Sequence, residues 1–171
     1  MSKEYTVKVY DNGNRFWLNE DGQMHCEHGP AIEYANGDKS WYLNGERHRE
    51  DGPAVEYAGG DKHWYLNGKQ HREDGPAIEY ANGDKFWYIN GERHREDGPA
   101  IEYANGDKSW YLNGERHRED GPAVEWADGS KDWYLKGKEL TEAEFNSRMK
   151  KPCSGKIVEV DGVKYKLVEV V

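Results

Sequence analysis

The chain has 171 residues, of which 35% are hydrophobic and 33% charged, and its formal net charge at pH 7 is -9. The low apolar fraction argues against a compact globule with a large core, while 7 Trp and 12 Tyr argue against a disordered chain. An acidic chain is a poor ligand for nucleic-acid phosphates or anionic lipid, and no apolar run is long enough to span a membrane. We therefore expect a soluble, cytoplasmic protein that binds neither membranes nor nucleic acid directly.

Residues 1–28 are a degenerate copy of the repeat that follows them. Tyr10 and Gly13 precede Phe16-Trp17-Leu18, and one extra residue stands before Gly22. Terminal repeats of an array are often atypical because they cover an otherwise open end. We expect this segment to be an N-terminal cap.

Residues 29–140 contain five repeats with a period of 23 residues. The unit reads GPAIEYANGDKSWYLNGERHRED, and its copies begin at Gly29, Gly52, Gly75, Gly98 and Gly121. Self-similarity at a fixed period predicts an array in which each unit packs mainly against its neighbours.

Each unit contains two hairpin signals, which in the first unit are Asn-Gly pairs, and Asn-Gly favours two-residue β-hairpin turns of type I′. Turns at Asn36-Gly37 and Asn44-Gly45 would place Ile32 opposite Trp41, and Tyr42 opposite Arg47. Side chains alternate between the two faces of a strand. This register predicts an apolar face that carries Ile32, Tyr34, Trp41, Leu43 and His48, and a polar face that carries Ala31, Glu33, Ser40, Tyr42, Arg47 and Arg49.

The predicted fold is all-β: an elongated antiparallel array of β-hairpin repeats that forms a single meandering sheet, curled by a bend at Gly52-Pro53. Residues 141–171 are expected to form a C-terminal cap. A capping box at Thr141–Glu144 predicts a short helix to about Lys150. A turn at 152–155 and a hairpin around Asp161-Gly162 are expected to follow it.

The unit resembles the MORN repeat, whose period is also 23 and whose aromatic, Asn-Gly, His and Gly positions follow the same order. Here these positions are Tyr34, Gly37, Trp41, Asn44-Gly45, His48 and Gly52. The form WYLNG-x-x-HR-x-DGPA-x-x-Y closely resembles the MORN-variant repeats of bacteriophages and large DNA viruses. The chain departs from the family after the His, where Arg49 and its equivalents replace the usual Gly.

The resemblance covers residues 5–140. It implies an elongated antiparallel sheet that serves as a scaffold or partner-binding surface. In a phage, it also implies a host-directed role such as inhibition of a defence protein.

No catalytic, metal or cofactor site is predicted, so we do not expect an enzyme. Histidines recur once per repeat, about 10 Å apart by strand spacing, too far apart for neighbours to share a metal ion. Glu50-Asp51 recurs in the same way, and we interpret it as solvated loop charge because a catalytic carboxylate pair needs one distinct pocket. Cys26 and Cys153 are the only cysteines, too few for a disulfide framework.

The polar face offers candidate partner-binding residues, because Tyr and Arg are enriched where binding energy concentrates. On the predicted register, tyrosines there lie opposite Arg or Gln, and Phe86 points outward at the variable position before the Trp. The same Tyr–Arg pairs are also consistent with a purely structural cation–π role. The candidates are Tyr42, Tyr65, Phe86, Tyr88, Arg93, Tyr111 and Arg116.

The predicted function is binding of a protein partner, such as a host defence protein that a phage-encoded chain would inhibit. One alternative is a sponge for nucleotides or signalling molecules, since Tyr, Trp and Arg stack bases and bind phosphate. A second alternative is an acidic mimic of nucleic acid.

Overall fold

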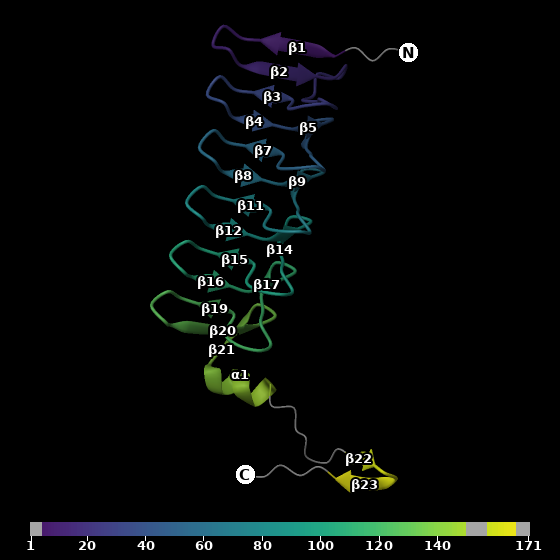
Figure 1. Ribbon diagram of the computed structural model, residues 1–171, viewed down its shortest axis with the longest axis vertical. Coiled ribbons are helices and arrows are strands. Elements are labelled where there is room, and N and C mark those ends of the chain that lie inside the picture. The colour runs from purple at the N-terminus through teal and green to yellow at the C-terminus, as the bar shows by residue number, and fades with distance from the viewer. Residues whose placement is uncertain (1–4, 150–156, 167–171) are drawn as a thin grey trace.

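A computed structural model describes residues 5–149 and 157–166. It confirms the predicted fold class: an open, antiparallel array of β-hairpin repeats followed by a short helix (Figure 1). In that described part of the chain, no helix is long and apolar enough to cross a membrane.

The main element is a 13-stranded sheet to which each repeat contributes two strands, except the last repeat, which contributes three. Its strands in spatial order are β1 (Thr6–Val9), β2 (Arg15–Leu18), β3 (Ile32–Glu33), β4 (Lys39–Ser40), β7 (Val55–Glu56), β8 (Lys62–His63), β11 (Ile78–Glu79), β12 (Lys85–Phe86), β15 (Ile101–Glu102), β16 (Lys108–Ser109), β19 (Val124–Glu125), β20 (Lys131–Leu135) and β21 (Lys138–Leu140).

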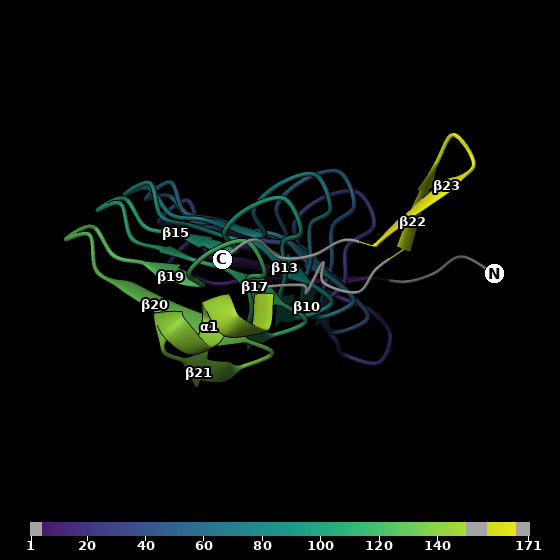
Figure 2. The same ribbon diagram turned by 90° about the horizontal axis from the view of Figure 1, so that it is seen from below.

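The second hairpin of each central repeat forms a two-stranded sheet of its own beside the main sheet. The prediction of one meandering sheet therefore holds for the first hairpins only. Seen along the array, the turns of successive repeats lie over one another in steps (Figure 2). These small sheets are β5 (Tyr42–Leu43) with β6 (Glu46–Arg47), β9 (Tyr65–Leu66) with β10 (Lys69–Gln70), β13 (Tyr88–Ile89) with β14 (Glu92–Arg93), and β17 (Tyr111–Leu112) with β18 (Glu115–Arg116).

The predicted register of the first hairpin is wrong by one residue. Ile32 lies opposite Ser40, not Trp41, and Glu33 lies opposite Lys39. A shift of one residue moves side chains to the opposite face. Ile32 therefore shares a face with Ser40, and the two predicted faces are mixed in this part of the repeat.

The cause is a three-residue loop at the first Asn-Gly pair. Only Gly37 has a positive φ, of 97°, and the Asn36 side chain accepts a hydrogen bond from the Asp38 N–H at 3.1 Å. The same loop forms in the next repeat without an asparagine, where Gly59 takes this place and Gly60 has a φ of 102°. A three-residue loop that ends in a left-handed glycine is the next commonest hairpin connection. Asp38 in turn accepts a bond from the N–H of Ala58 in the next repeat at 2.7 Å.

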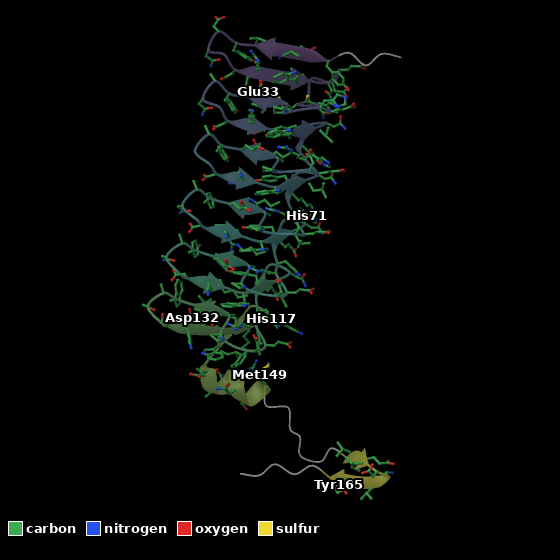
Figure 3. All side chains as sticks on the ribbon, viewed as in Figure 1. Glu33, His71, His117, Asp132, Met149 and Tyr165 are labelled. Carbon is green, nitrogen blue, oxygen red and sulfur yellow. The ribbon has the colours of Figure 1, made fainter. Side chains whose placement is uncertain are left out.

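The second hairpin has the predicted register, with Tyr42 opposite Arg47. Asn44 and Gly45 have φ of 49° and 84°, as a type I′ turn requires. The histidine of the preceding repeat fixes this turn, because Nδ1 of His25 accepts a hydrogen bond from the Asn44 N–H at 3.0 Å. Figure 3 shows His71 and His117 at these second hairpins.

A buried alanine layer joins successive repeats. The alanine of each Gly-Pro-Ala is 0% exposed, and the Trp87 N–H donates to the Ala100 carbonyl at 2.8 Å. Ala100, Ile101 and Tyr111 form a core cluster against which Trp87 packs. The core is thus spread along the array and does not lie at one centre.

Arg49 and its equivalents form a clamp in the Arg-Glu-Asp loop. The Arg49 guanidinium stacks over the Trp41 ring at 4.1 Å, pairs with Asp51 and Glu56 at 2.9 Å, and donates to the Pro53 carbonyl. The interpretation of the Arg-Glu-Asp runs as solvated loop charge is therefore wrong for Arg49, whose side chain is 22% exposed, but it holds for Asp51, which is 85% exposed although it pairs with Arg49. The clamp recurs at Arg72, Arg95 and Arg118.

The helix α1 (Glu142–Met149) begins at the predicted capping box: the Glu144 carboxylate accepts bonds from Thr141, whose Oγ1 accepts from the Glu144 N–H. Phe145 is 3% exposed and packs on Trp133 with ring centroids 4.6 Å apart. The hairpin of β22 (Ile157–Val160) and β23 (Val163–Lys166) follows in Figure 1. The predicted turn at 152–155, Cys153 and the end of the predicted hairpin (167–171) lie outside the described residues.

Candidate functional site

One face of the 13-stranded sheet carries a row of exposed aromatic side chains, one per repeat. Each is between 37% and 41% exposed. The corrected register places them on the side of the buried Ile32 and Val55. We call this row the aromatic face; it consists of Tyr34, Tyr57, Tyr80, Tyr103 and Trp126.

The variable position before the Trp lies between these rings. His63 contacts Tyr57 and Tyr80 at centroid distances of 5.4 and 5.6 Å. Phe86 contacts Tyr80 and Tyr103 at 5.6 and 5.5 Å. All four contacts are edge-to-face, the geometry that aromatic quadrupoles favour.

Phe86 is therefore not the outward-pointing aromatic that the sequence predicted. It is half-buried between two tyrosines and packs against the core cluster. The prediction failed because the one-residue shift of register turns this side chain toward the row of tyrosines.

The second hairpins form a wall beside the aromatic face, in which tyrosines and arginines alternate. Arg93 donates to the Tyr88 hydroxyl at 3.2 Å and lies 5.3 Å from the centre of the Tyr111 ring in the next repeat. The predicted cation–π contact is present at 6.0 Å between Arg93 and the Tyr88 ring, and the shorter contact with Tyr111 links two repeats. We call this the Tyr–Arg wall; it consists of Tyr42, Arg47, Tyr65, Tyr88, Arg93, Tyr111 and Arg116.

The structure gathers all seven candidate residues on one side of the array, but it leaves their rings largely covered. Tyr111 is only 7% exposed, and Tyr42, Tyr65 and Tyr88 are half-buried. The more exposed rings are those of the aromatic face, which sequence reasoning assigned to the other side. The tyrosine that precedes each Ala-Asn-Gly was a visible signal, but only the three-residue loop determines where it points.

Three arginines of the wall differ from the clamp arginines in their charged surroundings. Among residues 5–149 and 157–166, no carboxylate lies within ion-pair distance of Arg47, Arg93 or Arg116. Burial lowers the pKa of Arg93, but the hydrogen bond and charge interaction with Tyr88 outweigh it and raise the pKa overall. The guanidinium groups therefore stay charged. The clamp arginines differ, because each of them pairs with two carboxylates.

The two surfaces enclose a hollow of about 350 Å³ at the C-terminal end of the array. Its lining residues include Tyr103, Ser109 and Trp126 from the sheet, and Arg93, Tyr111 and Arg116 from the wall. Ser109 occupies the variable position, and its small side chain leaves the space that a ring fills in the two preceding repeats.

Charge interactions link the two surfaces in the middle of the array as well. Burial raises the pKa of Tyr80, and charge interactions with Asp61, Tyr88 and Tyr65 add to the effect. Burial also lowers the pKa of His63, whose charged form Arg47 further disfavours.

The opposite face of the main sheet carries an alternating ladder of charge. Glu33 lies opposite Lys39, and Lys39 lies opposite Glu56 of the next repeat. The same order continues through Lys62. Opposite charges on paired strands favour each other, so this face is locally neutral.

Hollows of about 730 and 760 Å³ lie between successive Arg-Glu-Asp loops, and one of about 690 Å³ lies between the 26–28 loop and the loop of Arg49. The one bordered by Trp64 is also lined by His71 and the clamp residues Arg49 and Arg72. These hollows repeat with the array, and their arginines are already paired with carboxylates. Within the described ranges, no group of three or more His, Cys, Asp or Glu could hold a metal ion.

Compared with protein-family models and with curated protein sequences, the chain matches none. The likeness to MORN repeats rests on the pattern of residues within the unit.

Proposed function

We propose that the chain is a non-enzymatic protein-binding module, and that the aromatic face and the Tyr–Arg wall together bind an acidic segment of a partner protein that carries aromatic side chains. One observation carries this proposal. In a chain of net charge -9, Arg47, Arg93 and Arg116 are half-buried, and the described part of the chain offers them no carboxylate. Half-buried guanidinium groups beside exposed rings are stabilised when the carboxylates of a partner pair with them.

The dimensions of the surface favour an extended segment. The aromatic face continues through five repeats, and strands lie about 4.8 Å apart, so each repeat advances roughly 10 Å. Contiguous exposed apolar surface commonly marks a binding site. The resemblance to MORN-variant repeats of phages supports a further step: the partner is a host defence protein in the cytoplasm, and binding inhibits it.

A nucleotide-binding sponge is the second candidate, and the hollow at Ser109 favours it because rings and arginines meet there. The length of the aromatic face exceeds what one nucleotide needs, which favours the protein partner. The alternating Glu–Lys ladder argues against a nucleic-acid mimic, because it leaves no continuous anionic strip on that face.

The test is selection of ligands from a random peptide library, followed by titration of the selected peptides. We expect acidic sequences with aromatic residues. The triple variant R47Q/R93Q/R116Q should then bind at least tenfold more weakly. Glutamine is a mild replacement, since Gln70 occupies this position in one repeat and bonds the Tyr65 hydroxyl at 3.4 Å.

The matched control is K39Q/K62Q/K85Q, which removes the same charge from the opposite face of the sheet. It should bind within about twofold of wild type, apart from weak long-range screening effects. Equal losses in the two triple variants would mean that only overall charge matters, and the proposed site would be rejected.

A further inference from the structure

We infer that the hollow over Ser109 is a slot for one aromatic side chain of the bound partner segment. The slot rests on the proposed function, and it makes that function specific. The partner's ring would lie between Tyr103 and Trp126, as Phe86 lies between Tyr80 and Tyr103.

The neighbouring repeats define the shape of the slot. Between Tyr80 and Tyr103, the ring of Phe86 makes edge-to-face contacts at 5.6 and 5.5 Å. Tyr103 and Trp126 flank Ser109 in the same way, because β16 pairs with β15 on one side and β19 on the other. Two flanking rings are therefore in place, and the bridging ring is replaced by a serine hydroxymethyl group.

The polar surroundings of the slot determine which ring fits. Arg93 and Arg116 line it, and both donate to tyrosine hydroxyls at 3.2 and 3.1 Å. Asp107 also lines it, but its oxygens already accept bonds from the Ala127 N–H at 2.7 Å and the Asn105 amide at 2.9 Å. The net attraction is for a ring with negative charge close by, as in an aromatic residue flanked by Glu or Asp.

The other serine of the array provides an internal comparison. Ser40 lies between the repeats of Tyr34 and Tyr57, but the wall beside it carries Arg47 alone. The preceding repeat has Met24 opposite Leu18, where an arginine would otherwise lie. The slot at Ser109 is therefore the more cationic of the two, and we assign the partner's ring to it.

The probes are two synthetic peptides, acetyl-Glu-Asp-Tyr-Glu-Asp-amide and the same peptide with Ala in place of Tyr, together with phenyl phosphate. The readout is the indole N–H signal of Trp126 in ¹⁵N-labelled protein, whose Nε1 donates to Asp132 at 2.9 Å. We expect the Tyr peptide to shift this signal and to bind at least tenfold more tightly than the Ala peptide.

The decisive variant is Ser109→Phe, which should fill the slot as Phe86 fills its own position and should reduce binding of the Tyr peptide at least tenfold. Ser40→Phe adds the same ring to the other gap and should leave binding within twofold. Three results would overturn the slot: the Tyr peptide fails to bind, the two peptides bind equally, or the Tyr peptide still binds the Ser109→Phe variant. Binding of phenyl phosphate alone would overturn it too, and would assign the hollow to a small aromatic anion.

The proposed function is separable from the slot in these measurements. If both peptides bind equally and R47Q/R93Q/R116Q abolishes both, the surface binds acidic segments and the slot is wrong. If Ser109→Phe weakens the Tyr peptide while the arginine variant does not, the ring site stands and the electrostatic part of the proposed function fails.

Discussion

The arginine clamp is the contact whose removal should cost the array most among its charged residues. In the second full repeat, Arg72 stacks 4.1 Å above the Trp64 ring, pairs with Glu79 at 2.9 Å and donates to the Pro76 carbonyl at 3.2 Å. We predict the effect of Arg72→Met, which keeps an unbranched apolar side chain over the indole and removes the guanidinium.

The magnitude follows from the three contacts. The cation–π contact contributes roughly 1 kcal/mol at a partly exposed site. The Glu79 side chain is 36% exposed, so solvent screening limits that pair to about 1 kcal/mol. The Pro76 carbonyl loses one hydrogen bond, worth about 0.5 to 1 kcal/mol. Arg72→Met should therefore lower the free energy of unfolding by about 2 to 3 kcal/mol.

Urea unfolding followed by tryptophan fluorescence and by far-ultraviolet circular dichroism measures this change. Coincident transitions and an unchanged m-value are needed for the comparison, because repeat arrays can unfold in parts. Lys62→Met is the matched control: it removes one charge from an exposed position on the neutral ladder and should cost less than about 0.5 kcal/mol. Equal, small losses in both variants would refute the structural role of the clamp.

Two titratable side chains and the repeat period give three other predictions. The hydrogen bond from Arg72 lowers the pKa of Asp74 below its ordinary value of 3.8. The stability that the ionised Asp74 contributes is therefore present above pH 3.8 and is lost as pH falls through the lowered pKa. Acid unfolding of Arg72→Met should lack this pH dependence, and a profile unchanged from wild type would contradict the prediction. Burial lowers the pKa of His63 below 6.5, and its Nε2 has no hydrogen-bond partner among the described residues. Stability should therefore fall as pH drops from 6.5 through the lowered pKa, and His63→Phe should remove that loss in melting curves at pH 7 and pH 5. Deletion of Gly75–Asp97 should leave a folded array, whereas deletion of about 12 residues should not; circular dichroism that is equal for both would argue against a repeat-by-repeat array.

The second hairpin was predictable from sequence and the first was not, although both contain Asn-Gly. At Asn44-Gly45 both residues have positive φ, and the local preference of the pair determines the register. At Asn36-Gly37 only the glycine has a positive φ, and the same three-residue loop forms at Gly59-Gly60. In both repeats the aspartate after the glycine accepts a bond from an N–H 20 positions away. A contact between repeats leaves no local pattern that distinguishes the two turns.

The candidate site shows the same division. The Tyr–Arg pairs were predictable because the second hairpin sets them side by side. Tyr34 was correctly assigned to the face of Ile32, but the variable position and the Tyr–Arg pairs were assigned to the opposite face, because their placement relative to Ile32 depends on the first hairpin. Two features depend on how three successive repeats pack: the absence of a described carboxylate beside Arg93 and Arg116, and the slot at Ser109. The spacing of residues within one unit does not specify this packing.

The most direct test of the central claim is a crystal structure of the protein bound to a peptide selected from the random library. The peptide should lie between the aromatic face and the Tyr–Arg wall, with carboxylates on Arg93 and Arg116 and a ring over Ser109. A peptide bound on the Glu–Lys ladder or between the Arg-Glu-Asp loops would show that the proposed binding surface is wrong.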